Sequence, residues 1–149
     1  MIKSTVCYLV HDEKWLMLLR NKKQNDLNHG KWIGVGGKLK ENEAPYECMV
    51  REVIEETGYQ VQSALYCGII HFHYQHHEDE EIYVYQTSDY VGTLHECSEG
   101  TLAYIPKKGI LDLELWEGDR IFLKKMFRNE VPFSIHLYYD ENEILIKSE

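Results

Sequence analysis

The chain has 149 residues, which suits one domain with a sizeable core, and its 44% hydrophobic and 28% charged residues are ordinary for a globular protein. No apolar run approaches the roughly 20 residues of a membrane span, so we expect no membrane-spanning segment. The formal net charge of −9 argues against binding along a long nucleic acid. It still allows a single anionic nucleotide, because metal ions can supply positive charge locally.

The N-terminal segment predicts a β-hairpin. Residues 2–10 alternate between apolar and polar side chains, residues 15–19 form a short apolar run, and residues 11–14 form the turn. No long apolar stretch ends in small residues here, so the segment is not typical of a secretory signal.

Cysteine usage also favours a cytoplasmic protein. Four scattered cysteines, with no C-x-x-C pair, are most simply reduced and buried thiols, although a four-cysteine zinc site is the alternative. They are Cys7, Cys48, Cys67 and Cys97.

A polar loop over residues 21–29 leads into the glycine-rich segment 32–38. One interpretation of this segment is a bulged strand end. The other is a close approach of the backbone to a metal ion or phosphate, which a Cβ atom would block. Both remain open on the sequence alone.

The segment that follows predicts an amphipathic helix. Pro45 suits its first turn, and Gly58 suits the left-handed residue that ends it. Between them a mostly apolar stripe recurs at helical spacing. Its members are Tyr46, Met49, Val50, Val53, Ile54 and Thr57.

Three glutamates gather on another side of this helix. Glu52, Glu55 and Glu56 are spaced i, i+3, i+4, so their like charges repel and lower helix stability slightly. A solvated acidic face is the plain interpretation. The functional one is a site for Mg²⁺ or Mn²⁺, hard cations that prefer oxygen ligands. Arg51, four residues before Glu55, can pair along the helix and fix carboxylate geometry.

The remainder of the chain predicts more strands, a last helix and a closing hairpin, which together with the first part make one α+β domain over residues 1–149. The expected strands are 61–74, 81–88 and 101–105, the expected helix is 119–129, and the expected hairpin pairs 133–139 with 143–147.

The spaced set around the glutamates resembles the Nudix box of the MutT-type hydrolases at every fixed position. Gly37 is followed after five residues by Glu43, and after seven more by the run Arg51-Glu52-Val53-Ile54-Glu55-Glu56-Thr57-Gly58-Tyr59. Tyr59 stands where the family usually has an aliphatic residue, which should affect packing alone.

The resemblance implies the Nudix fold, a mixed β-sheet between helices, and a Mg²⁺-dependent hydrolase in which Mn²⁺ can substitute. The implied metal ligands are Glu52, Glu55, Glu56, the backbone carbonyl of Gly36 and Glu99. One of the three helix glutamates would accept a proton from the attacking water; the residues do not say which. Arg51 and Glu43 would orient the cluster.

The chain also resembles the mammalian-type oxidised-purine diphosphatases of this family over nearly its whole length. That resemblance implies a base pocket near Trp116 and Asp119, with Trp32 as a further lining residue. Two positions depart from the base-reading pattern: Ile33 replaces an asparagine, and Gly118-Asp119 replaces two adjacent aspartates. Candidate phosphate contacts are Lys22, Lys23, Lys38 and the backbone of Gly36 and Gly37.

Plainer interpretations exist for these residues. Asp119 is an N-cap candidate for the last helix, Trp116 is a core candidate, and each lysine suits a solvated surface. His71, His73, His76 and His77 form a cluster that the family does not explain. A transition-metal site there is the alternative to partly exposed strand and turn histidines.

The expected reaction is hydrolysis of a nucleoside triphosphate such as 8-oxo-dGTP to a monophosphate and pyrophosphate, by a monomer or homodimer. Other Nudix substrates are the alternatives within the enzymes: an RNA 5′ end, a dinucleoside polyphosphate or a nucleotide sugar. A non-catalytic nucleotide-binding regulator is the alternative outside them.

Overall fold

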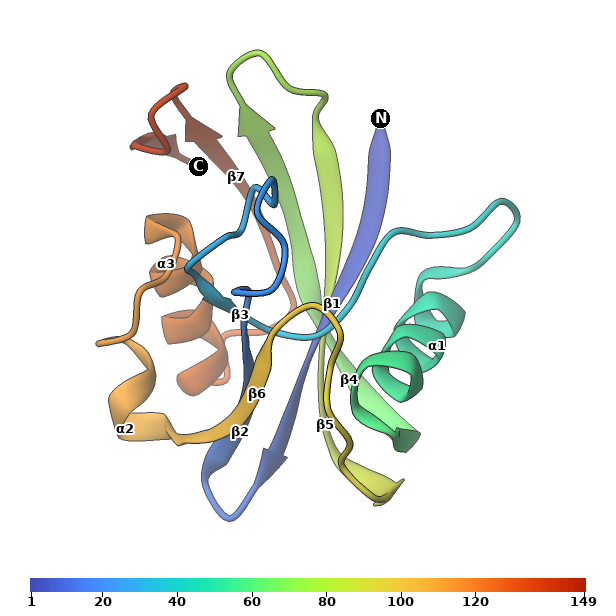
Figure 1. Ribbon diagram of the computed structural model, residues 1–149. Helices are drawn as coiled ribbons and strands as arrows, with labels where there is room; N and C mark the ends of the chain where they lie inside the picture. Colours follow the sequence, from blue (N-terminus) through green and yellow to red (C-terminus); the bar gives the residue numbers. More distant parts are fainter.

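An eight-stranded mixed sheet lies between helices in the computed structural model, which describes residues 1–149 (Figure 1). The strand order is β3-β2-β1-β5-β4-β7-β8, and β6 pairs with β2. The pairs β1–β5 and β4–β7 are parallel, and the others are antiparallel. The strands are β1 (Ile2–His11), β2 (Lys14–Leu19), β3 (Trp32–Ile33), β4 (Tyr59–Tyr74), β5 (Glu80–Gly92), β6 (Thr101–Pro106), β7 (Phe133–Tyr139) and β8 (Leu145–Ser148).

The helices cover opposite faces of this sheet, so the prediction of a sheet between helices is confirmed. Helix α1 (Pro45–Thr57) lies on one side, and α2 (Lys107–Ile110) and α3 (Glu117–Phe127) lie on the other (Figure 1). The centre of β1 is buried on both faces, and its successive side chains point alternately into two different cores. Cys7 and Leu9 belong to the core under α1, whereas Tyr8 belongs to the larger core under α3.

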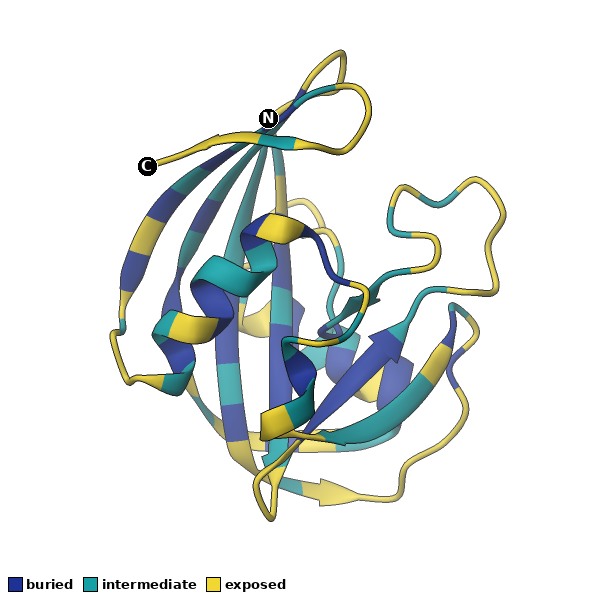
Figure 2. Ribbon diagram, turned by 90° about the vertical axis from the view of Figure 1, so that its left-hand side faces the viewer, coloured by how far each residue is buried: buried dark blue, intermediate teal, exposed yellow.

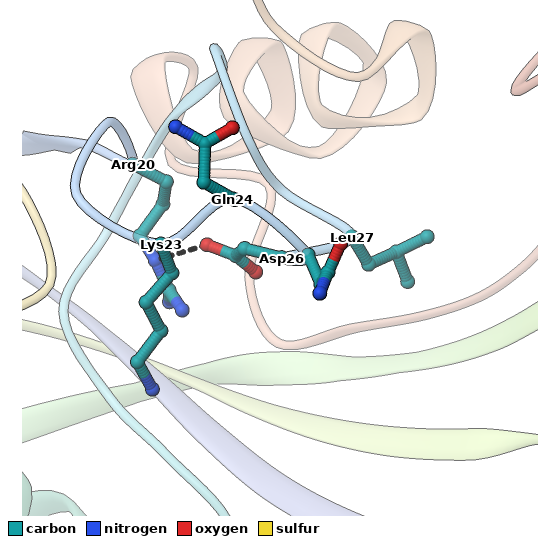
Figure 3. A pocket seen from close by; sticks show the side chains of 6 residues that line it. Arg20, Lys23, Gln24, Asp26 and Leu27 are labelled. Atoms are coloured by element: carbon teal, nitrogen blue, oxygen red, sulfur yellow. Dashed lines mark ion pairs between the residues drawn. The ribbon is translucent and has the colours of Figure 1, made fainter.

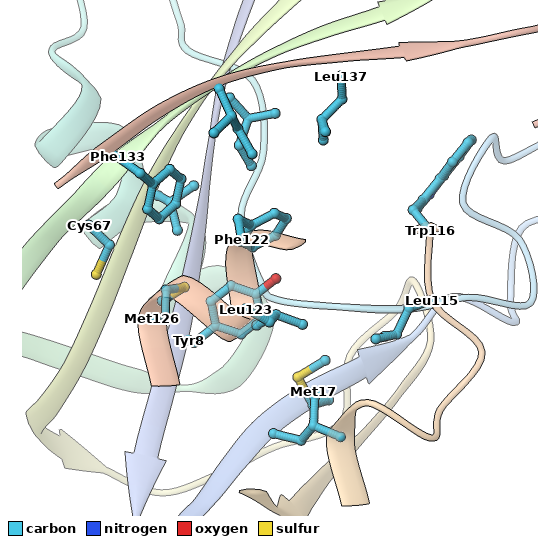
Figure 4. Close-up of a cluster of buried hydrophobic side chains, with 14 of the residues drawn as sticks. Tyr8, Met17, Cys67, Leu115, Trp116, Phe122, Leu123, Met126, Phe133 and Leu137 are labelled. Atoms are coloured by element: carbon cyan, nitrogen blue, oxygen red, sulfur yellow. The ribbon is translucent and has the colours of Figure 1, made fainter. Parts of the chain in front are cut away.

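The larger core is rich in aromatic rings. Phe122, Leu123 and Met126 of α3 pack against inward side chains of the central strands, and Trp116 lies at one side of the same cluster (Figure 4). Burial decreases from these strand centres to the connecting loops (Figure 2). The sheet therefore separates two apolar layers, and polar site residues gather at its loops.

Helix α1 begins and ends as the sequence predicts. Pro45 is its first residue, and Gly58 ends it with a left-handed φ of 88°. The predicted buried stripe of this helix is only partly correct. Met49, Val53 and Thr57 are buried, but Ile54 is 43% exposed. Glu56 is buried instead, because the helix docks on the sheet rotated toward that residue.

Several predicted boundaries need correction. Strands β4 and β5 extend beyond the expected 61–74 and 81–88, because β-bulges keep them paired through irregular register. Helix α3 begins at Glu117 and not at Asp119, and the short α2 was not predicted. All four cysteines are free and buried, as expected. None of the helices combines the length and apolar character needed to cross a membrane.

Candidate active site

The glycine-rich segment and the end of α1 meet at Glu56. The backbone N–H of Gly36 donates a 2.8 Å hydrogen bond to Glu56 Oε2, and Glu56 is only 7% exposed. A Cβ atom at Gly36 would clash with the backbone of Thr5 in β1, and one at Gly37 would clash with the Glu52 carboxylate. Glycine is therefore required at position 36 for the close approach to β1, whereas a side chain at position 37 would displace the Glu52 carboxylate.

Glu99 completes a pair of enclosed carboxyl groups. It lies in the loop before β6, within hydrogen-bonding reach of Glu56. Burial, followed by the contact with Glu99, raises the pKa of Glu56 to about 9. The pKa of Glu99 is lowered, because the Glu56 hydrogen bond and the cations Arg20 and Lys23 outweigh its burial. The two carboxyl groups therefore titrate as a coupled pair, in which burial and the neighbouring carboxylate favour the protonated form of Glu56.

Arg51 holds the other acidic side chains of the box. Its Nε and one terminal nitrogen contact the two oxygens of Glu43 at 2.7 Å and 2.9 Å. Its other terminal nitrogen contacts Glu52 at 2.8 Å and Glu55 at 3.4 Å. The bidentate pair lowers the pKa of Glu43 to about 2. Arg51 thus fixes three carboxylates at one end of the site.

The donor set fits a hard divalent cation. Glu52, Glu55, Glu56 and Glu99 supply carboxylate oxygens, the preferred ligands of Mg²⁺, beside backbone groups of Gly36. No three acidic, His or Cys side chains already converge as metal ligands, because Glu52 and Glu55 are turned toward Arg51. A bound cation would neutralise the charge of the Glu56–Glu99 pair. It would also compete with Arg51 for the carboxylates of Glu52 and Glu55.

The loop between β2 and β3 reaches the acidic end of the site. Arg20 Nε contacts Asp26 at 2.7 Å, and both side chains are largely buried (Figure 3). Lys23 Nζ contacts Glu99 at 3.2 Å, and Lys22 Nζ donates to the backbone carbonyl of Cys97 at 2.7 Å. An open cavity of about 470 Å³ is lined by this loop, with Arg20, Lys23, Gln24, Asn25, Asp26 and Leu27 around it.

The aromatic end of the site centres on Trp116. The indole is 4% exposed and lies edge-to-face with Phe72, Tyr74 and Tyr139. Its Nε1 donates a 2.8 Å hydrogen bond to Asn28 Oδ1. Trp116 is therefore a core residue of which one side meets the β2–β3 loop.

Asp119 lies one helical turn after Trp116, and the N-cap interpretation of it is wrong. The N-cap of α3 is Trp116, with no side-chain cap bond, and Asp119 is the third residue of the helix. Its carboxyl points inward near Tyr8 and Tyr139. Burial raises the pKa of Asp119 to about 7, although Arg120 and Lys31 act in the opposite direction.

The other sequence-predicted residues lie at the margins. Trp32 is half-buried against the α3 core, and its backbone N–H donates to the backbone carbonyl of Glu114. The backbone carbonyl of Lys38 accepts a 3.2 Å hydrogen bond from Arg51. No sequence pattern pointed to Arg20, Asn28 and Lys31 as site residues. Of the three, only Lys31 lies next to a predicted site residue, directly before Trp32.

The histidines form a ladder on the sheet face opposite α3. His73 Nε2 lies 3.0 Å from His136 Nδ1, the His71 ring stacks on His136, and Asp79 contacts His73 Nδ1 at 3.0 Å. These rings bond to one another and to carboxylates, and they do not converge as a set of three metal ligands. His76 lies in the β4–β5 turn, as expected.

Comparison with known proteins agrees with this geometry. The NUDIX domain family matches residues 1–126. The chain is 25% identical over 133 residues to the uncharacterized Nudix hydrolase YvcI of Bacillus subtilis, covering 86% of this chain and 80% of that protein. It is 22% identical over 130 residues to the oxidized purine nucleoside triphosphate hydrolase of Mus musculus, covering 87% and 83%.

Solved structures show the same fold. The MutT protein of Bacillus halodurans has a TM-score of 0.90 at 21% identity and covers 100% of this chain and 97% of its own. The MutT protein of Methanosarcina mazei Go1 has a TM-score of 0.76 at 24% identity, covering 88% and 96%. The family match and the box carboxylates around Arg51 agree, and the chain is a Nudix hydrolase, a member of the NUDIX domain family.

Proposed function

We propose that this Nudix hydrolase cleaves nucleoside triphosphates to a nucleoside monophosphate and pyrophosphate with Mg²⁺, and that oxidised purine nucleotides such as 8-oxo-dGTP are its substrates. The observation that carries the proposal is the enclosed Glu56–Glu99 pair beside the carboxylates held by Arg51. Carboxylate oxygens clustered in this way are suited to bind divalent cations. Divalent cations in turn bind the phosphate oxygens of a triphosphate.

The chemistry assigned to the chain is proton transfer and positioning. A water oxygen attacks an inner phosphorus, and the anhydride bond to the next bridging oxygen breaks, so that the bridging oxygen leaves with pyrophosphate or with the monophosphate. One of Glu52, Glu55 and Glu56 accepts the proton of the water. Bound Mg²⁺ would screen the phosphates and lower the pKa of that water. Arg51 and Glu43 hold the carboxylates in place.

Two lysines are suited to the phosphate end. Lys23 and Lys22 lie beside Glu99 and the Cys97 carbonyl, on the loop that borders the open cavity. A cation held by Glu99 would compete with Lys23 for the carboxylate and leave the Lys23 ammonium available to a phosphate oxygen. The backbone N–H groups near Gly37 and Lys38 are further candidates at this end.

The base end is assigned to Trp116, Asp119 and Trp32. Support comes from the aromatic surroundings of Trp116 and from the inward Asp119 carboxyl. The mouse relative is named for oxidized purine nucleoside triphosphates, which agrees with this assignment. Ile33 offers no hydrogen bond, so we expect the preference for the oxidised base to be smaller than in that relative.

The test is a panel of nucleoside triphosphates, dinucleoside polyphosphates and nucleotide sugars with Mg²⁺, scored for phosphate, pyrophosphate and monophosphate. We expect monophosphate and pyrophosphate, with 8-oxo-dGTP among the best substrates. In isotope-labelled water the label should enter the monophosphate or the pyrophosphate. Label found only in free orthophosphate, or turnover confined to a non-triphosphate substrate, would contradict the proposal.

A further inference from the structure

Lys31 lies directly over the ring of Trp116. Its Nζ is 4.7 Å from the ring centroid, a cation–π distance, and 2.6 Å from Glu143 Oε1 in the β7–β8 turn. The side chain is only 17% exposed. A lysine this enclosed is unusual, since lysine side chains are mostly solvated. The ammonium therefore occupies a defined position on the ring proposed to stack on the base.

The backbone of Lys31 is fixed on both sides. Its N–H donates to the carbonyl of Asn28 at 2.9 Å, and its carbonyl accepts from the N–H of Arg20 at 3.0 Å. Asn28 itself holds the indole N–H of Trp116. A base that stacks on Trp116 must displace the ammonium from the ring face. Because the backbone is tethered, the displaced ammonium stays within reach of the rim of the base.

The groups around this position form a donor beside an acceptor. The lysine ammonium has three N–H donors and accepts nothing. The Asp119 carboxyl lies close enough to interact electrostatically with Lys31, and its ionised form accepts hydrogen bonds. Ile33, on the neighbouring strand β3, contributes no polar group. Asn28 is engaged by the indole N–H and Glu143 by the Lys31 ammonium, so Lys31 and Asp119 are the charged groups left to face a base.

Purine edges differ in the pattern that such a pair can read. Guanine presents a carbonyl oxygen, O6, an acceptor, with N–H donors next to it on the same edge. Adenine presents an amino group at the same position, which is a donor. An ammonium donates to a carbonyl oxygen but meets an amino group donor to donor, which leaves both unpaired and costs binding energy.

We propose that Lys31 is a specificity-determining residue whose ammonium donates to the 6-carbonyl oxygen of the base, so that guanine-type nucleotides are selected over adenine-type ones. The proposal rests on the function proposed above and adds the base class to it. Glu143 holds the ammonium on Trp116 before the nucleotide binds, and the base carbonyl replaces that contact afterwards.

The experiment compares kcat/KM of the full chain and of Lys31→Met for 8-oxo-dGTP, dGTP and dATP. Loss of one hydrogen bond to a charged group should lower kcat/KM for the two guanine-type substrates by about 10- to 100-fold. For dATP the value should stay within about threefold, because no hydrogen bond of that kind is lost. The glutamine of Lys31→Gln offers both a donor and an acceptor. This variant should therefore raise kcat/KM for dATP relative to that for dGTP.

Lys107→Met is the matched control. Lys107 also lies over an aromatic ring, at 5.2 Å from the Phe127 centroid, but on the exposed α2. The Lys107→Met variant removes the same type of contact away from Trp116. The ratio of kcat/KM for dGTP to kcat/KM for dATP should therefore not change. Thermal unfolding of all variants separates loss of fold from loss of recognition.

The outcomes distinguish this inference from the proposed function. An equal loss for dGTP and dATP in Lys31→Met would overturn the inference and leave the triphosphatase intact, since Lys31 would then act on the phosphates or the fold. Absence of pyrophosphate release by the unaltered chain would overturn the proposed function. In that case calorimetric binding of dGMP and dAMP decides: the inference requires dGMP to bind more tightly and Lys31→Met to abolish the difference.

Discussion

The acidic end and the aromatic end of the site are built in different ways. At the acidic end Arg51, Glu52, Glu55 and Glu56 come from one helix. Arg51 contacts Glu52, Glu55 and the nearby Glu43, and only Glu99 is added by a distant loop. At the aromatic end the groups come from three separate segments: Asn28 and Lys31, Trp116 and Asp119, and Glu143.

The difference predicts which substitutions are local and which are not. Charges that lie on one helix are arranged by helix geometry, so changing one of them alters chemistry and leaves the fold largely intact. Trp116 is part of the apolar core. A change there alters stability and recognition together, and only a matched core control separates the two.

The largest effect is expected at the acidic end. Glu55→Gln or Glu56→Gln should lower kcat by about 1,000-fold or more, because a lost metal ligand removes several kcal/mol of transition-state stabilisation. Excess chelator should abolish activity as well. Glu47→Gln is the control, since Glu47 lies on the same helix but only caps the N–H of Ala44. Near-normal turnover in a folded Glu55 or Glu56 variant would remove this end from the mechanism.

Arg51→Lys tests whether orientation matters beyond charge. Lysine keeps the positive charge but cannot contact Glu43 through two nitrogens and Glu52 at the same time. We expect kcat to fall by about 10- to 100-fold, less than on loss of a metal ligand, with a smaller change in KM. Unchanged kcat would mean that the helix alone orients the carboxylates.

Trp116→Ala tests the aromatic end against Trp15→Ala. Both indoles are buried in the same core, so each variant should lose about 3–5 kcal/mol of stability. Only Trp116→Ala should also raise KM, by roughly 5- to 150-fold if stacking on the base contributes about 1–3 kcal/mol. If alanine prevents folding, Trp116→Phe and Trp15→Phe serve in the same comparison. Equal KM values would make Trp116 purely a core residue.

The smallest effects are expected from Asp119→Asn. Burial raises the pKa of Asp119 to about 7, so the folded state favours the protonated carboxyl. The contribution of this group to the free energy of unfolding is fully present below about pH 4, where the carboxyl is protonated in both states. It is lost as the pH rises from about 4 to 7. Asparagine does not titrate, so the melting temperature of the unaltered chain should fall by several degrees relative to the variant over this range.

Recognition gives the second readout for Asp119→Asn. If the carboxyl reads the base edge, the ratio of kcat/KM for 8-oxo-dGTP to that for dGTP should change, because the amide alters which groups donate and accept. An unchanged ratio, together with an unchanged pH dependence of stability, would show that Asp119 neither titrates inside the fold nor contacts the base.

The sequence by itself determined the helix that carries most of the acidic end. Pro45 and Gly58 set the limits of α1, and the i, i+3, i+4 spacing placed the glutamates on one part of its surface. These are local properties, because the pitch of a helix and the conformations open to proline and glycine do not depend on distant residues.

Only the tertiary structure decided what each side chain faces. It buried Glu56 against Glu99, exposed Ile54, moved the helix N-cap to Trp116 and brought Lys31 over the indole. No periodicity in the polar loop predicts that last contact, since it joins positions 85 residues apart (116 minus 31). Rotation of a helix on a sheet and the path of a loop depend on packing against distant elements, which local spacing does not encode.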